Sequence, residues 1–105
     1  MSDAQKRKEA PIYSGVIKYF PDALEEVSRV SFAGNEQHNP GKSLFWDRTK
    51  SMDQLDALVR HLKDHAGGEI IDTDGRRHLA KVAWRALAQL QLDIENDKEN
   101  DKESK

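Results

Sequence analysis

The sequence predicts an all-α fold, a compact bundle of about three helices with long connecting loops. Three stretches space their apolar residues with the period of an α-helix, and no stretch shows the convincing alternation of a strand. With 105 residues the chain has room for one small domain. Three short helices leave more apolar surface than one subunit can cover, so we expect a homo-oligomer.

The first predicted helix begins at Pro21, because the fixed φ angle of proline suits a first helical turn. Phe20 precedes it and is placed to pack on Leu24. Gly34 is a natural end for this helix. The core-facing side of the helix consists of Leu24, Val27, Val30 and Ser31.

The second predicted helix begins at Ser51, which forms a capping-box pattern with Gln54 three residues later. Gly67 and Gly68 end it. Its apolar residues recur at the spacing of one helix face, and they are Leu55, Leu58, Val59 and Leu62.

The third predicted helix covers residues 76–94, with Asp72 or Asp74 as the cap at its start. Its apolar stripe consists of Leu79, Val82, Ala83, Ala86, Leu87, Leu90 and Ile94. Together the second and third helices predict a buried core, made of Leu55, Leu58, Leu62, Leu79, Val82, Leu87 and Leu90.

Both ends of the chain are polar and contribute little to a core. We expect residues 1–12 to be a disordered N-terminal arm, residues 13–94 to be a single helical domain, and residues 95–105 to be a charged disordered tail.

Composition excludes several classes of function. The net charge is −2, from 17 basic and 19 acidic residues, so no basic surface predicts a nucleic-acid partner. The chain has no cysteine, which excludes disulfides, thiolate zinc sites and a cysteine nucleophile. No apolar run approaches the roughly 18 residues of a membrane span, so we expect a cytoplasmic protein with no membrane partner.

Two aromatic and basic segments are candidates for ligand binding. The long loop of residues 34–50 carries Phe45 and Trp46, which can stack on a base, and Arg48, which can reach a phosphate. Alternatively, these aromatic residues anchor the loop to the core. The second segment precedes the first helix and contains Tyr13, Lys18 and Tyr19.

The start of the third helix is a candidate phosphate site. A helix N-terminus presents free N–H groups to anions, and Arg76 and Arg77 would add charge-assisted hydrogen bonds. The alternative is an ordinary turn in which an aspartate caps the helix. His61 and His78 flank this segment, either as ligands of a metal or phosphate or as locally bonded structural residues.

Several segments in a fixed order resemble a known phage family. They are PDALEEVSRVSFAG at 21–34, a loop with Asn39 and Trp46, ALVRHL at 57–62, and GGEIIDTDGRRHLAKVAW at 67–84. Over roughly residues 15–92 the chain is similar to the N-terminal domain of dATP/dGTP diphosphohydrolases. The resemblance implies purine deoxynucleotide handling in the cytosol of an infected bacterium.

Related MazG-like pyrophosphohydrolases hold magnesium with an ExxE motif followed by an ExxD motif. Here Glu69 and Asp72 have the ExxD spacing, but no ExxE is present in the first helix. The resemblance therefore implies at most a weak Mg or Mn site, from Glu25, Glu69, Asp72 and Asp74. The last three would be the catalytic carboxylates if the chain is an enzyme.

Three hypotheses follow from these observations. The first is a protein that binds a purine nucleotide, or a nucleotide-derived and possibly cyclic defence signal, and sequesters it without turnover. The second is a Mg- or Mn-dependent dATP/dGTP diphosphohydrolase that releases pyrophosphate. The third is a structural helical interaction module, in which Trp84, off the main apolar stripe, is a candidate for contacts between subunits.

Overall fold

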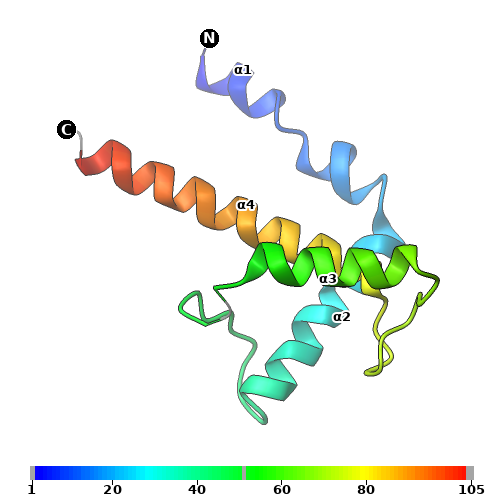
Figure 1. The fold of residues 1–105 in the computed structure, drawn as a ribbon. Coiled ribbons are helices and arrows are strands. Elements are labelled where there is room, and N and C mark those ends of the chain that lie inside the picture. The colour runs from blue at the N-terminus through cyan, green and yellow to red at the C-terminus, as the bar shows by residue number, and fades with distance from the viewer. Residues whose placement is uncertain (1, 51, 104–105) are drawn as a thin grey trace.

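The computed structural model describes residues 2–50 and 52–103, and within them the fold is all-α (Figure 1). The predicted fold class is confirmed, although the helices outnumber the three expected. In chain order they are α1 (Asp3–Lys8), the short π-helix η1 (Tyr13–Ile17), α2 (Pro21–His38), α3 (Gln54–Ala66) and α4 (His78–Glu103). The described residues form no strand, only an isolated bridge between Ile71 and Arg77.

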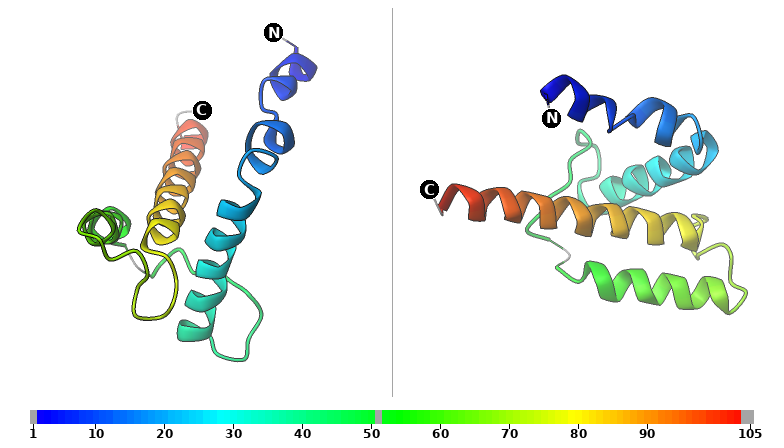
Figure 2. Two further views of the ribbon diagram at one scale, coloured as in Figure 1. Left: turned by 90° about the vertical axis from the view of Figure 1, so that its right-hand side faces the viewer. Right: turned by 90° about the horizontal axis from the view of Figure 1, so that it is seen from above.

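Helix α4 is the centre of the molecule, with α3 on one side and α2 on another (Figure 2). Helices α3 and α4 run antiparallel, because Gln54 bonds to Arg85 at one end of the pair and His61 bonds to His78 at the other. The segment with α1 and η1 and the last turns of α4 extend away from this body (Figure 1).

The core of the chain is small. Among the described residues, the buried apolar ones are all alanines, namely Ala57, Ala80 and Ala88. Alanine lets helices approach closely, but it removes little apolar area from water. Polar side chains complete the buried interior, namely Asn35, Gln54 and His78.

The predicted leucine core is wrong for the single chain. Leu55 is 59% exposed, Leu87 is 52% exposed and Leu90 is 56% exposed, and Leu62 and Leu79 are exposed as well. Of the seven residues, only Leu58 and Val82 are half-buried. The apolar residues do lie along one face of each helix, but these faces point away from the contacts between the helices. The periodicity therefore identified the apolar faces and not what covers them.

Several helix ends differ from the predicted ones. Gly34 lies inside α2, which continues to His38, because a glycine in a helix interior is a modest cost rather than a stop. Helix α3 begins at Gln54 after Asp53, and Ser51 lies outside the described residues. Gly67 ends α3 as predicted.

The start and end of the last helix also differ. Helix α4 begins at His78, after a tight turn in which the Asp74 carboxylate accepts a bond from the Arg76 N–H. It then continues through most of the segment predicted to be a charged tail. Likewise, α1 lies within the predicted arm and buries none of its residues.

None of the described helices has the length and apolar character needed to cross a membrane.

Candidate functional site

A cleft of about 550 Å³ lies between α2, the loop that follows it, and the inner sides of α3 and α4. This volume is in the range of small-molecule sites. Aromatic residues, amides and cations all contribute to its lining. Those used below are Asn35, Phe45, Trp46, Lys50, His61, Asp74, Lys81, Trp84 and Arg85.

Two tryptophans form the aromatic wall of the cleft. Trp46 and Trp84 meet edge to face, with ring centroids 5.6 Å apart and an interplanar angle of 74°. The Trp84 Nε1 donates a hydrogen bond to Ser31 Oγ of α2 at 2.6 Å, which fixes the indole across the helix contact. Because two elements hold each ring, the wall is preorganised for a flat ligand.

Arg48 supports this wall from behind. Its guanidinium carbon lies 4.2 Å from the centre of the Trp46 ring, a cation–π contact. The same guanidinium donates two hydrogen bonds to the Glu95 carboxylate, at 2.8 and 3.0 Å. Arg48 therefore connects the loop to α4, and its side chain is already engaged.

Asn35 holds the loop that carries Phe45. The Asn35 side chain is 6% exposed; its amide donates to the Lys42 carbonyl at 3.0 Å, and its carbonyl accepts from the Phe45 N–H at 3.2 Å. Asn39 donates to the same carbonyl. One buried amide thus bonds to both a carbonyl and an N–H of the loop backbone. These bonds hold the exposed Phe45 ring at the mouth of the cleft.

Lys81 lies at an edge of the cleft, between two aspartates. Its ammonium lies 2.7 Å from Asp72 Oδ2 and 2.8 Å from Asp74 Oδ2. The hydrogen bond from Lys81 holds the pKa of Asp72 at about 2, below its usual 3.8. Burial lowers the pKa of Lys81, but the hydrogen bonds to the two carboxylates outweigh it and raise that pKa. All three groups are therefore charged at neutral pH.

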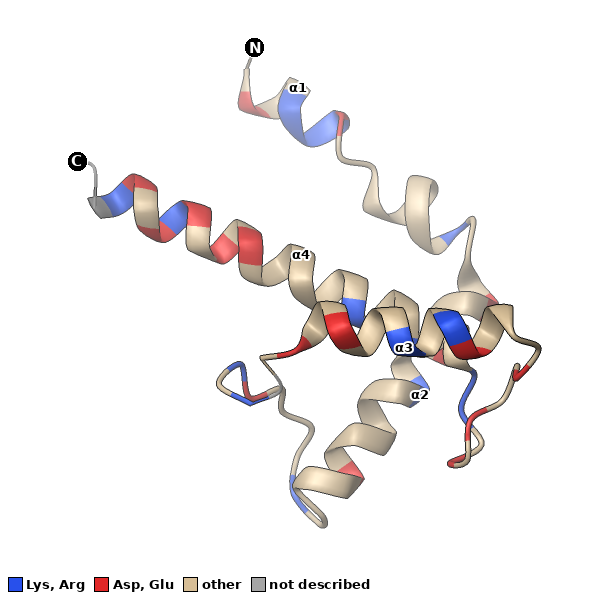
Figure 3. Ribbon diagram, in the orientation of Figure 1, with Lys and Arg blue, Asp and Glu red and all other residues tan. Residues whose placement is uncertain are grey.

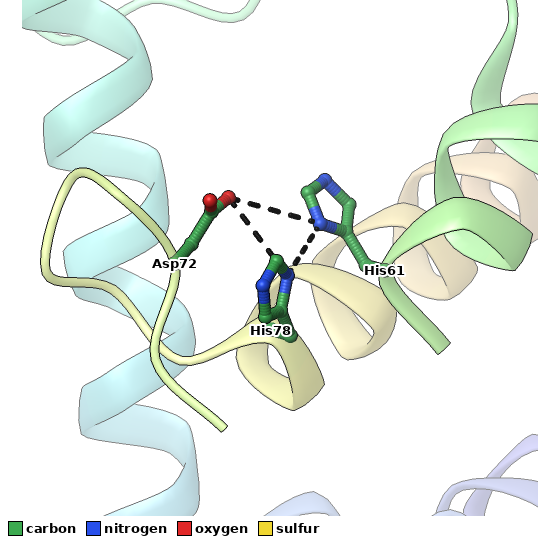
Figure 4. A group of neighbouring side chains, drawn as sticks. All are labelled: His61, Asp72 and His78. Carbon is green, nitrogen blue, oxygen red and sulfur yellow. Dashed lines mark hydrogen bonds and ion pairs between the residues drawn. The ribbon is translucent and has the colours of Figure 1, made fainter. Parts of the chain in front are cut away.

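A second polar group lies beside this edge (Figure 4). The Nδ1 atoms of His61 and His78 are 2.9 Å apart, and Asp72 Oδ2 lies 3.9 and 3.8 Å from them. Burial, and then the Lys81 charge, lowers the pKa of His61, which favours a neutral ring. In a neutral pair, one Nδ1 carries the proton and the other accepts it.

These three residues also satisfy the geometry of a metal site. Their ligand atoms lie within 4.8 Å of one another, as do those of a second group, Asp64, Glu69 and His78. His78 is 1% exposed, and its Nε2 lies 3.5 Å from Glu69 Oε1 without a hydrogen bond. Two imidazoles and a carboxylate are a donor set that suits a transition metal.

The structure brings only some of the predicted ligand residues together. Phe45, Trp46 and His61 line the cleft, with Arg48 and His78 directly behind it. Arg76 and Arg77 lie at the turn before α4 and do not line the cleft. Three more predicted residues lie outside the cleft lining, on the segment before α2, and they are Tyr13, Lys18 and Tyr19.

The predicted metal ligands do not converge. Glu25 pairs with Arg29 on α2 at 2.7 Å and belongs to neither metal-binding group. Asp72 and Asp74 face Lys81, and Glu69 lies on the far side of His78. Sequence reasoning overlooked Asn35, Lys81 and Arg85, because each is embedded in a helical pattern that hides its tertiary partners.

The fold and the cleft define a class: a small all-helical domain with a cleft lined by aromatic and charged residues. The particular family follows from a match to a family model. The chain belongs to the dATP/dGTP diphosphohydrolase N-terminal family, whose model matches residues 2–103. Searches among curated proteins and among solved structures found no match.

Proposed function

We propose that this chain binds a purine nucleotide in the cleft beside α4 and holds it without turnover. The observation that carries the proposal is the pairing of an aromatic wall with a lysine edge in one cavity. A purine needs a flat apolar surface, and its phosphates need cations. Family membership supports the choice of a nucleotide over other flat anions.

The base is assigned to the aromatic side of the cleft. Phe45 is 66% exposed at the mouth, and the fixed Trp46 and Trp84 rings lie further in. Stacking a base on an aromatic side chain contributes about 1–3 kcal/mol. The exposed Phe45 ring is free to close over a base that rests on the wall.

The phosphates are assigned to the opposite side, near the start of α4. Lys50, Lys81 and Arg85 all line the cleft, and Lys81 is the one that lies in the first turn of α4. Lys81 is 16% exposed, and a phosphate that bonds to it shares the ammonium with Asp72 and Asp74. Charge-assisted bonds to phosphate are among the stronger hydrogen bonds in proteins.

The position of Lys81 supports binding over hydrolysis. A two-metal site needs several carboxylates directed at one spot. Here the Lys81 ammonium already bonds to Asp72 and Asp74, and Asp74 belongs to neither group of residues that could hold a metal ion. A protein that holds a purine nucleotide without cleaving it lowers the free concentration of that nucleotide, whether it is linear or a cyclic defence signal.

The hydrolase remains a second candidate on one observation. The ligand atoms of His61, Asp72 and His78 are close enough for one ion, and His61 lines the cleft. A divalent metal there would reach a phosphate bound at Lys81. The residues fit such an ion only if Lys81 moves from Asp72 Oδ2.

Calorimetry with dATP, dGTP and cyclic purine nucleotides, with and without EDTA, tests the proposal. We expect binding that survives EDTA and weakens with added salt. Trp46→Ala and Lys81→Gln should each weaken binding by on the order of 10-fold. Phe20→Ala and Lys98→Gln are the matched controls, because they remove an aromatic residue and a lysine outside the cleft.

Chromatography of the recovered ligand separates the two candidates. An intact nucleotide after incubation with magnesium or manganese supports binding without turnover. Pyrophosphate release that stops with EDTA and with Asp72→Asn supports the hydrolase. Binding that is equal in the parent, Trp46→Ala and Lys81→Gln places the ligand elsewhere and overturns the assignment to this cleft.

A further inference from the structure

The α3–α4 pair carries an uncovered apolar face. On α3, Leu55 and Val59 are each 59% exposed, and Leu62 is 45% exposed. On α4, the exposed residues are Leu79, Leu87, Leu90 and Ile94, with exposures of 48%, 52%, 56% and 41%. Large apolar side chains that recur at helical spacing and remain in water are characteristic of an interaction surface.

The two stripes lie on the same side of the pair. Each exposed α3 residue follows by one position a residue directed toward α4, as Leu55 follows Gln54 and Leu62 follows His61. On α4, Leu79 follows His78 in the same way. A step of one residue is a turn of about 100°. In two antiparallel helices this rotation has opposite senses when both are viewed from one end. The residues that follow the inward-facing positions therefore lie on the same side of the pair, and so do both stripes.

Helix α2 covers the opposite side. Trp84 precedes Arg85 by one position, and the Trp84 indole bonds to Ser31 of α2. Neither the nucleotide cleft nor α2 therefore shields the apolar face. The middle of α4, residues 86–92, carries no charged side chain, as Figure 3 shows, whereas the last turns of the helix carry both signs.

The exposed area is large for a chain of this size. The accessible surface is 8276 Å² for a mass of 12.0 kDa, whereas a compact monomer of that mass exposes about 6,000 Å². The difference is about 2,300 Å², shared between this face and the extended ends. Even half of it exceeds the roughly 800 Å² that each partner buries in a standard interface.

The shape of the chain leads to the same conclusion. Its radius of gyration is 16.3 Å, against about 13 Å for a compact domain of this length. In the described part of the chain the buried apolar core consists of three alanines, which is too little apolar burial for an independently stable domain. The missing core must be supplied by a surface of similar shape and polarity.

We propose that a second copy of this chain covers the face, so that two α3–α4 hairpins form a four-helix bundle about a twofold axis. A twofold contact needs one self-complementary patch, and an uncharged leucine-rich face meets that requirement. Asp56, Arg60 and Lys63 lie one further position around α3 and form the polar rim of the interface. The α2 clefts stay on the outer sides of the dimer.

Light scattering at micromolar concentration is the first test. The parent should have twice the 12.0 kDa chain mass. Leu90→Glu should raise the dissociation constant by on the order of 100-fold, because the twofold axis buries two like charges. Asn96→Glu, an exposed position on the same helix outside the stripe, should leave the mass unchanged.

A second measurement separates loss of the dimer from loss of folding. Because the chain has no native cysteine, one introduced cysteine can be cross-linked cleanly. Leu87→Cys should give a covalent dimer with a short bismaleimide, and Glu36→Cys on α2 should not. A parent that is monomeric at micromolar concentration overturns the proposal, as does efficient cross-linking at Glu36 alone. Neither result bears on nucleotide binding, since the cleft lies on the other side.

Discussion

At the scale of single residues, Lys81 determines what the site can do. Its ammonium pairs with both Asp72 and Asp74 and offsets one of their two negative charges. Burial, and then the charge of the same ammonium, lowers the pKa of the neighbouring His61 ring, which favours its neutral form. One side chain thus sets the charge of an entire edge of the cleft.

The Lys81–Asp72 pair predicts a specific loss of stability in acid. The pKa of Asp72 is about 2 in the folded chain and 3.8 as a free carboxyl, so its stabilisation is present above about pH 4 and is lost between about pH 4 and 2. Lys81→Met should lower the free energy of unfolding at pH 7 by about 2 kcal/mol. The difference from the parent should shrink toward pH 2, as measured by urea denaturation.

Lys98→Met is the control, because Lys98 is exposed near the end of α4. His61 contributes a second pH dependence in the parent and in Lys98→Met. Because its pKa is lowered in the folded chain, the free energy of unfolding decreases as the pH falls below about 6.5. A Lys81→Met deficit that stays constant down to pH 2 would contradict the role given to Asp72.

How much of the site is predictable depends on whether a residue stands out from its local sequence pattern. Phe45 and Trp46 stand out because aromatic residues in a long polar loop are unusual. Lys81 does not stand out, because it sits among apolar residues of a helix and its carboxylate partners lie in the preceding turn. Asn35 is equally hidden, since its function is to bond a loop backbone.

At the scale of the elements, two glycines have opposite roles. Gly34 lies inside α2, and a Cβ added there meets nothing within 4 Å. Gly75 has a φ of +82° in the turn before α4, where its N–H bonds to the Asp72 carbonyl. A left-handed φ is strained for any residue with a Cβ, whereas a helical position favours alanine.

Gly34→Ala should therefore raise the free energy of unfolding by about 1 kcal/mol, and Gly75→Ala should lower it by a similar amount. Denaturant titration followed by circular dichroism measures both. If the two substitutions shift the midpoint in the same direction, the assignment of Gly34 to the helix interior is incorrect.

The sequence predicts helices better than it predicts their ends. Pro21 begins α2 and Gly67 ends α3, because proline and glycine restrict or extend the local backbone directly. Gly34 does not end α2, because a single glycine is outweighed by the packing of the turns around it. The start of α4 is set by the turn that contains Asp72 and Gly75, which a cap pattern alone does not reveal.

At the scale of the whole molecule, the apolar periodicity was right and the predicted burial was wrong. Leu55 and Leu90 lie on continuous stripes, as expected, yet both remain exposed in the single chain. Periodicity states which side of a helix avoids water and does not state whether the covering surface belongs to the same chain. The apolar core of the proposed dimer therefore includes residues that a single chain leaves exposed.

The uneven packing of the molecule predicts where a protease cuts first. Helix α1 buries no residue, and the described segment before α2 has no extensive contact with the other helices. Trypsin should cleave first within residues 6–18, because local opening costs little there. Arg60 and Lys63 are equally exposed but lie on the packed α3, so they are internal controls. First cleavage at either would contradict this order.

The aromatic wall has one further consequence. The chain has two tryptophans, and both line the cleft in contact with each other, with the Arg48 guanidinium over the Trp46 ring. Nearly all of the intrinsic fluorescence of the protein therefore originates at the proposed base site. The polarity and quenching of that emission depend on the contents of one cavity, so the protein carries its own optical probe of occupancy without any label.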